Sequence, residues 1–221
     1  MNDKITVILT HYKRLDLLQQ TIDSFTCTNI YPIDEFIIID DSAEKYYNEE
    51  VIRLYGNIAN IIINENNLGQ RRSIDKLIDA CNNEYIFHLE EDWKFDGKSK
   101  KYIENSLLIL KNKPEIHQVH VRHHNDCVHP VIGDVQYIND VSYKFLDPNF
   151  RDVWNGFSFN PGLRRKSDIN KMFPNGLEEF EDELQAALHT KQFDYRAVRL
   201  EDTVCHHIGW HNRTQIGGRG F

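Results

Sequence analysis

Apolar residues follow two different periods along the first 90 residues of the chain. Short continuous apolar runs, each the length of a buried strand, alternate with stretches in which apolar residues recur three or four positions apart, as on the buried side of a helix. The predicted strands are Lys4–Thr10, Glu35–Asp41, Ile58–Ile63 and Tyr85–Leu89, and the helical stripes contain Leu15, Leu18, Ile22 and Phe25, then Val51, Leu54 and Tyr55, then Ile74, Leu77, Ile78 and Cys81. This order predicts an α/β fold with a mostly parallel central sheet flanked by helices, because strands that are apolar throughout need cover on both faces.

The pattern is less regular in the second part of the chain, and from His123 to Asn160 it predicts no element. The further elements that we expect are a helix over Tyr102–Leu110, a strand over Gln118–Arg122, a helix that begins with Leu163–Met172, a helix over Glu178–Leu188 and a strand over Tyr195–Leu200. No internal repeat or low-complexity linker divides the 221 residues, so we interpret residues 1–221 as a single domain.

Polar side chains follow each of the first four predicted strands at the point where the strand ends. They are Thr10 and His11, then Asp40 and Asp41, then the turn Asn67–Gln70, and finally Glu90, Glu91 and Asp92. Right-handed crossovers bring the carboxyl ends of parallel strands to one edge, and open α/β sheets bind their ligands there. The sequence therefore predicts a binding site at this edge of the sheet.

The three adjacent acids Glu90, Glu91 and Asp92 repel one another unless water or a cation lies among them. Glu90 and Asp92, two positions apart, point to the same side of an extended segment. The pair could share an oxygen-seeking divalent ion such as Mg²⁺ or Mn²⁺. The alternative is a strand end that is simply solvated.

The charge and cysteine content of the chain exclude some classes of ligand and partner. The formal net charge is −8 and no basic block is present, which argues against binding to nucleic acid. The four cysteines form no CxxC motif, which argues against a thiolate zinc site or a disulfide scaffold. The apolar run near the N-terminus is too short for a signal peptide or a membrane anchor, so we expect a cytoplasmic protein without a transmembrane segment, although peripheral association with a membrane stays open.

Taken in order, the segments ITVILTHYKR, EFIIIDDS, NNLGQRRSIDKLIDACNNEYIFHLEED, NPGLRR, FEDELQAAL with FDYRAV, and TVCHH resemble family 2-like glycosyltransferases of the GT-A fold. The resemblance runs from about Lys4 to His207. It implies a Rossmann-like sheet, a nucleotide-sugar-binding half over residues 1–125, and an irregular acceptor-side half with a C-terminal tail over residues 126–221.

The resemblance also implies roles for the residues at the sheet edge. It places the donor nucleotide-sugar against Thr10, His11, Tyr12, Asp40, Asp41, Gly69, Arg71, Glu90 and Glu91. Asp40 is preferred over Asp41 for contact with the base or ribose, and a helix N-cap is the alternative for Asp41. The family usually has Asp where this chain has Glu90, and Glu91 is expected to turn away from the ion.

The resemblance implies that Asp92 and His206 hold a divalent cation, Mn²⁺ or Mg²⁺, with His206 preferred over its neighbour His207. It implies that Asp182 is the catalytic base, with Glu181 as second choice, because an acceptor hydroxyl loses its proton as it attacks. An acidic first turn of a helix is the alternative there. On the acceptor side it implies Trp154, Gly162 and Arg164.

These expectations describe a metal-assisted, inverting glycosyltransferase that uses a nucleotide-diphospho-sugar, first of all a UDP-sugar, and a hydroxyl acceptor on a glycan, a lipid-linked molecule or a protein. The sugar, the acceptor and the oligomeric state stay open. A non-catalytic nucleotide-sugar-binding or glycan-binding domain is one alternative. A zinc hydrolase is another alternative, although no HExxH motif occurs. It is suggested by the histidines at positions 117, 120, 123, 124 and 129, together with His206, His207 and His211.

Overall fold

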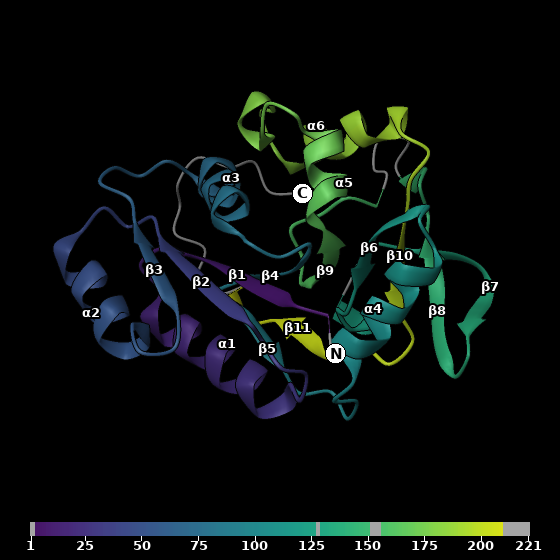
Figure 1. Ribbon diagram of the computed structural model, residues 1–221, viewed down its shortest axis with the longest axis horizontal. Helices are drawn as coiled ribbons and strands as arrows, with labels where there is room; N and C mark the ends of the chain where they lie inside the picture. The colour runs from purple at the N-terminus through teal and green to yellow at the C-terminus, as the bar shows by residue number, and fades with distance from the viewer. Residues whose placement is uncertain (1–2, 127–128, 151–155, 210–221) are drawn as a thin grey trace.

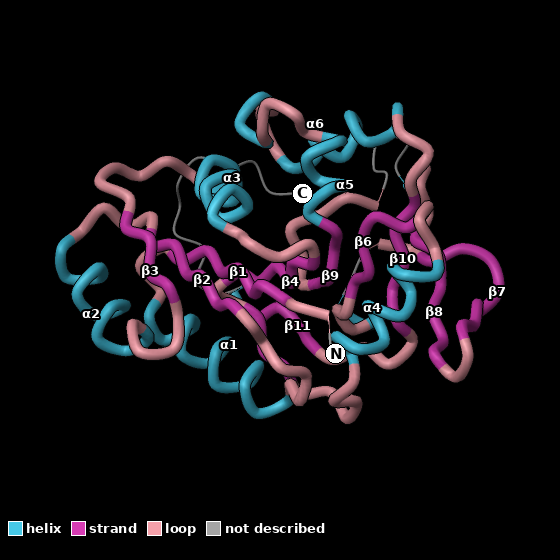
Figure 2. Tube along the Cα trace, viewed as in Figure 1, coloured by secondary structure: helices cyan, strands magenta, loops and turns pink. Residues whose placement is uncertain are grey.

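The computed structural model describes residues 3–126, 129–150 and 156–209. Its centre is a nine-stranded sheet with the strand order β3-β2-β1-β4-β9-β6-β10-β8-β7 (Figures 1 and 2). The strands are β1 (Ile5–His11), β2 (Glu35–Asp40), β3 (Asn60–Ile63), β4 (Tyr85–Glu90), β6 (Ile116–His120), β7 (Val131–Ile138), β8 (Val141–Leu146), β9 (Gly162–Arg165) and β10 (Arg196–Leu200). The strands β3, β2, β1 and β4 are parallel neighbours, and β9 lies antiparallel between β4 and β6, so β6 and its parallel partner β10 keep the common direction. The prediction of a mostly parallel central sheet is confirmed.

Helices cover both faces of the sheet, and each covered face has its own apolar core (Figure 1). The helices are α1 (Leu15–Thr28), α2 (Lys45–Tyr55), α3 (Gln70–Ala80), α4 (Tyr102–Asn112), α5 (Lys166–Met172) and α6 (Glu183–His189). One core joins α1, α2 and α4 to the sheet, and the other joins α3, α5 and α6 to the opposite face. Successive strand residues therefore enter different cores, as Val7 and Ile8 of β1 do, which explains why these strands are apolar throughout.

The second half of the chain corrects two of the predicted elements and adds a hairpin that was not predicted. The expected helix within Leu163–Met172 begins only at Lys166, because the residues before it form β9 between two buried strands. The expected helix over Glu178–Leu188 is a 3-10 turn followed, after a break, by α6. The segment with no predicted element contains the β7–β8 hairpin, whose strands are only half buried and so lack a strong pattern.

A second, two-stranded sheet brings the late part of the chain back to the acid run. It consists of β5 (Trp93–Phe95) and β11 (Cys205–His207), paired antiparallel with His207 opposite Trp93. In Figure 1, β11 lies beside β5 below the central sheet. Residues more than 100 positions apart in sequence therefore meet directly after β4 ends.

Within the described ranges, no helix is both long enough and apolar enough to cross a membrane.

Gly162 has a packing role in this sheet. A Cβ atom at Gly162 would lie 2.4 Å from the carbonyl oxygen of Val119 in β6. The lack of a side chain is what lets β9 fit between β4 and β6, so the expected role of Gly162 on the acceptor side has a structural alternative.

We predict that Gly162→Ala lowers the free energy of unfolding by about 1–3 kcal/mol, since the neighbouring backbone has to move. Urea denaturation measures this change. Asn60→Ala, an exposed position in β3, is the control and should change stability by no more than about 0.5 kcal/mol. Equal stability of the two variants would show that β9 has room for a side chain.

Candidate functional site

The four parallel strand ends meet in register at one edge of the sheet. Along the ladders, His11 of β1 stands beside Asp40 of β2, and Thr10 stands beside Glu90 of β4. An open cleft of about 390 Å³ lies over this edge. The residues that line it are Thr10, His11, Tyr12, Arg14, Asp41, Asn67, Gly69, Gln70, Ser73, Glu90 and Glu91. Seven of the nine predicted donor-binding residues thus lie around one cleft, and Asp40 and Arg71 do not line it.

Asp40 lies beneath the cleft rather than in its wall. Its carboxylate is fully buried, 3.1 Å from His11 Nδ1, and it accepts hydrogen bonds from the backbone N–H and the hydroxyl of Ser42. The other ring nitrogen of His11, Nε2, is buried without a partner among the described residues. Asp40 therefore orients His11, and the sequence-based preference for Asp40 over Asp41 as the ligand contact is not supported by its burial.

Asp41 lines the cleft and holds the turn that leads into α3. One carboxylate oxygen accepts hydrogen bonds from Asn64 Nδ2 and the backbone N–H of Leu68, each at 2.8 Å, and the other accepts from the N–H of Gly69 at 2.8 Å. The alternative of an N-cap for the helix after Asp41 does not hold, because α2 begins only at Lys45. Asp41 instead shapes the cleft wall at Gly69.

The three acids at the end of β4 differ in environment. Burial raises the pKa of Glu90 well above its ordinary value, and the negative charges of Asp92 and Glu183 raise it further. Glu90 accepts hydrogen bonds from Gln70 Nε2 and from Trp93 Nε1. Burial also raises the pKa of Glu91, with Asp92 adding to the effect. The crowding of carboxylates that the sequence predicts is therefore present, and it creates a demand for positive charge.

Two cationic or basic side chains meet this demand. Arg14 donates to Glu91 Oε1 from Nε at 2.8 Å, and its Nη1 lies 2.9 Å from Asp92 Oδ2. His207 Nε2 lies 3.1 Å from the same oxygen of Asp92. Burial alone would raise the pKa of Asp92, but His207 and Arg14 outweigh burial and hold the pKa below its ordinary value. Asp92 is thus the member of the acid run whose surroundings favour the carboxylate form despite burial.

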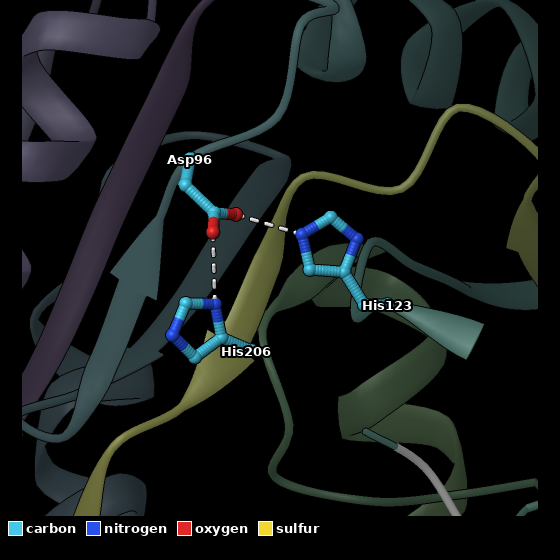
Figure 3. A group of neighbouring side chains, drawn as sticks. All are labelled: Asp96, His123 and His206. Atoms are coloured by element: carbon cyan, nitrogen blue, oxygen red, sulfur yellow. Dashed lines mark hydrogen bonds and ion pairs between the residues drawn. The ribbon is translucent and has the colours of Figure 1, made fainter. Parts of the chain in front are cut away.

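The structure does not bring together the predicted metal pair Asp92 and His206. Neighbouring residues of a strand point to opposite sides, so only one of the two histidines of β11 can face Asp92, and it is His207. His206 instead lies against Asp96, close to His123 (Figure 3). Of the histidines considered for a zinc hydrolase, His123 and His206 belong to a metal-like group among the described residues, together with Asp96.

The catalytic base predicted at Asp182 has a structural task. Asp182 is exposed and caps α6, since its carboxylate accepts a hydrogen bond from the N–H of Gln185 at 2.8 Å. Glu181, the second choice, is exposed as well. The next residue, Glu183, faces inward: its Oε1 accepts from the N–H of Phe159 at 3.1 Å, and burial raises its pKa to about 7. Glu183 is also close enough to Glu90 for their charges to interact.

Arg164, expected on the acceptor side, is a buried counter-charge. It is 3% exposed, donates to the carbonyl oxygen of Ser158 at 2.9 Å, and interacts electrostatically with Glu183 and Glu90. Burial lowers its pKa to about 10. Arg164 therefore balances the two acids from beneath the site. Trp154 lies outside the described residues, and Arg71 carries a buried Nε without a partner among the residues described.

The sequence-based site omitted Arg14 and ranked His207 second. It included Glu183 only as one of the neighbouring acids that leave the register of the base open by one or two positions. Each of the three residues carried a usable signal. Arg14 follows the first strand by three positions, Glu183 adjoins the predicted Asp182, and His207 adjoins the predicted His206. The sequence pattern does not fix the residue at which α6 begins or the side of β11 that faces Asp92. Both depend on contacts with residues that are distant in the sequence.

Comparisons with known proteins agree with this geometry. Residues 6–101 match the family model described as glycosyl transferase family 2. The chain is similar to the mannosyltransferase PcManGT from Pyrobaculum calidifontis, solved in complex with GDP-Man and Mn²⁺, with 16% identity, a TM-score of 0.64, and coverage of 94% of this chain and 57% of that one. The chain has a GT-A fold.

A second similar structure is S. aureus TarS 1-349 in complex with UDP, at 13% identity and a TM-score of 0.63, covering 92% of this chain and 60% of that one. The same TarS segment in complex with UDP-GlcNAc has 12% identity and a TM-score of 0.61, covering 92% of this chain and 58% of that one. The chain thus spans less than two thirds of the length of these GT-A proteins. No curated protein matches the chain.

The residues that line the cleft all fall within the family match, whereas Glu183 and His207 lie beyond it. The family match therefore covers the residues that line the cleft. The other residues of the candidate site, Glu183 and His207, come from the second half of the chain.

We predict that Asp41→Ala lowers the free energy of unfolding by about 3 kcal/mol, because hydrogen bonds to a charged group each contribute about 1.5–3 kcal/mol. Thermal or urea unfolding measures the loss. Glu65→Ala, exposed in the same turn, is the control and should be close to neutral. A neutral Asp41→Ala variant would mean that the turn before α3 holds its shape without this carboxylate.

Proposed function

We propose that the chain transfers a glycosyl group from a nucleotide-diphospho-sugar to a hydroxyl acceptor, with inversion at the anomeric carbon and with help from a divalent cation. A UDP-sugar is the first donor to test, because two of the similar structures are complexes with UDP or UDP-GlcNAc. The complex of PcManGT with GDP-Man makes a GDP-sugar the second.

One observation carries the proposal. The acid run at the end of β4, the inward-facing Glu183 and the Asp92–His207 pair converge beside one cleft of a GT-A fold. A glycosyl transfer needs charge compensation for a leaving diphosphate and a base for the acceptor hydroxyl. The two kinds of group are present in this structure, and they come from different parts of the chain.

The donor nucleotide is assigned to the cleft. Thr10, His11, Tyr12 and Asp41 line it. Arg14 lies at the same cleft and carries the positive charge closest to the acid run. We assign Arg14 to the diphosphate, since an arginine forms strong charge-assisted hydrogen bonds to phosphate oxygens.

The donor set suits a divalent cation. Asp92 Oδ2 and His207 Nε2 are 3.1 Å apart, and Asp92 is kept ionised. A carboxylate and an imidazole are reasonable ligands for Mn²⁺, and a Mg²⁺ or Mn²⁺ ion commonly takes its remaining ligands from substrate phosphates and water. When bound, the ion would supply charge stabilisation for the leaving diphosphate. Asp92 and His207, rather than Asp92 and His206, are the residues that we assign to it.

Glu183 is assigned as the base that accepts the proton of the acceptor hydroxyl. A pKa of about 7 suits a general base at neutral pH, because the group is then available as carboxylate yet still basic. Arg164 beneath it is a positioning residue that keeps part of Glu183 ionised.

We predict that Glu183→Gln abolishes transfer, with a loss of at least about 100-fold in kcat, while nucleotide binding stays close to that of the unchanged chain. Asp182→Asn is the matched control, because asparagine caps a helix as well as aspartate does and transfer should persist. The reverse result, with Asp182→Asn inactive and Glu183→Gln active, would restore the sequence-based assignment.

The same assignment predicts the pH dependence. Glu183 acts as a base only when deprotonated, so kcat/KM should rise with pH, reach a plateau above about 7, and fall about tenfold per pH unit below it. A pH profile of kcat/KM at saturating metal measures this. A profile with no inflection between pH 6 and 8 would count against Glu183.

We predict that His207→Ala weakens Mn²⁺-dependent binding of UDP or GDP by at least about tenfold, whereas His206→Ala leaves it within about threefold, since only His207 faces Asp92. Isothermal titration calorimetry with Mn²⁺ as the sole divalent ion measures both variants. Stronger loss in His206→Ala than in His207→Ala would contradict the metal assignment.

A further inference from the structure

A second group of metal-type ligands lies on the far side of β11 from Asp92. Asp96, His123 and His206 come from three segments, and one ligand atom of each lies within 4.8 Å of the others (Figure 3). The two carboxylate oxygens of Asp96 face different rings: Oδ1 is 2.7 Å from His123 Nε2, and Oδ2 is 3.1 Å from His206 Nδ1. Figure 3 shows both rings turned toward the carboxylate.

The backbone holds these three segments together independently of their side chains. The N–H of His123 donates to the carbonyl oxygen of Cys205 at 2.8 Å, and the N–H of Asp96 donates to that of Val204 at 2.9 Å. Gly97 allows the close approach, because a Cβ atom there would lie 2.5 Å from the Cα atom of Val204. The three side chains are therefore brought together by a prearranged frame, which is what a metal site requires.

A second contact fixes the orientation of His123. Its Nδ1 lies 3.0 Å from the hydroxyl oxygen of Thr203. Histidines that bind metals commonly engage their other ring nitrogen in such a hydrogen bond, which sets the tautomer and leaves the ligating nitrogen with its lone pair. With Thr203 at Nδ1, the Nε2 atom of His123 is the one that faces Asp96.

We propose that Asp96, His123 and His206 bind a divalent transition-metal ion, Zn²⁺ first of all. Two imidazole nitrogens and one carboxylate oxygen are a common ligand set for zinc, with water in the fourth position. Imidazole ligands favour zinc over Mg²⁺, whereas the carboxylates at the end of β4 suit Mg²⁺ or Mn²⁺. The chain therefore offers two cation environments of different selectivity, separated by the strand β11.

The bound ion would fasten β11 to the segments after β5 and β6. The residue next to His206 is His207, which contacts Asp92, so a fixed β11 also fixes that histidine. The role is structural and does not depend on glycosyl transfer. A failure of the proposed function would leave this site standing, and a failure of this site would leave the proposed function standing.

The test uses the full chain without a polyhistidine tag, dialysed against ZnCl₂ and then against metal-free buffer, with zinc measured by elemental analysis. We expect His123→Gln to lose one equivalent of zinc relative to the unchanged chain. That equivalent should remain in Asp92→Asn, because Asp92 lies on the other side of β11. His124→Gln, the neighbouring histidine outside the group, is the matched control and should retain it.

A thermal-unfolding series gives a second reading. Zinc at about 100 times its Kd should raise the Tm of the unchanged chain by roughly 5–10 °C and should raise the Tm of His123→Gln by far less. Circular dichroism without metal shows whether His123→Gln is folded, and Asp96→Asn is the second variant if it is not. Equal zinc content in His123→Gln and the unchanged chain would overturn the proposal, leaving an ordinary aspartate–histidine ion-pair cluster.

Discussion

The repulsion among the carboxylates at the end of β4 is the constraint on which the site depends. Glu90, Glu91 and Asp92 are adjacent, largely removed from water, and joined by Glu183 from the other half of the chain. Such a cluster is stable only when positive charge compensates it or when some members stay protonated. The fold uses both solutions, since Arg14 pairs with two of the acids while the pKa of Glu90 and of Glu183 is raised.

The basic side chains around the carboxylates come from three separate elements of the fold. Arg14 comes from the loop after β1, Arg164 from the inserted antiparallel strand β9, and His207 from the short strand β11. The two faces of the sheet are filled by separate apolar cores, which leaves the strand ends as the place where polar groups can gather. In the proposed function, this carboxylate cluster lies where a metal ion would accompany the donor diphosphate.

The first half of the fold could be predicted because its strands and helices have strong, local apolar periods. The second half could not, for reasons that particular residues make clear. Residues Gly162 to Arg165 form a strand because they pair with β4 on one side and β6 on the other. A segment of four residues has no hydrophobic pattern that could predict this pairing. The β7–β8 hairpin is half exposed and has no strong period.

The candidate site likewise contains residues whose positions could be predicted from the sequence and others whose positions could not. Seven of the nine donor-binding candidates lie around the cleft, because strand ends in a parallel sheet must meet at one edge, and their role in binding stays a prediction. The choices between His206 and His207, and between Asp182 and Glu183, each turned on a shift of one residue. In a strand that shift reverses the side chain, and at a helix start it separates a capping residue from an inward-facing one.

We propose that this cleft transfers the glycosyl group of a nucleotide-diphospho-sugar with Glu183 as base. Release of nucleoside diphosphate from UDP-sugars and GDP-sugars tests this, with Mn²⁺ and a hydroxyl acceptor pool, for the unchanged chain and for Glu183→Gln. We expect Mn²⁺-dependent release that requires the acceptor and is lost in Glu183→Gln. Tight binding of a nucleotide-sugar with no release under any of these conditions would contradict it and would identify the chain as a binding domain.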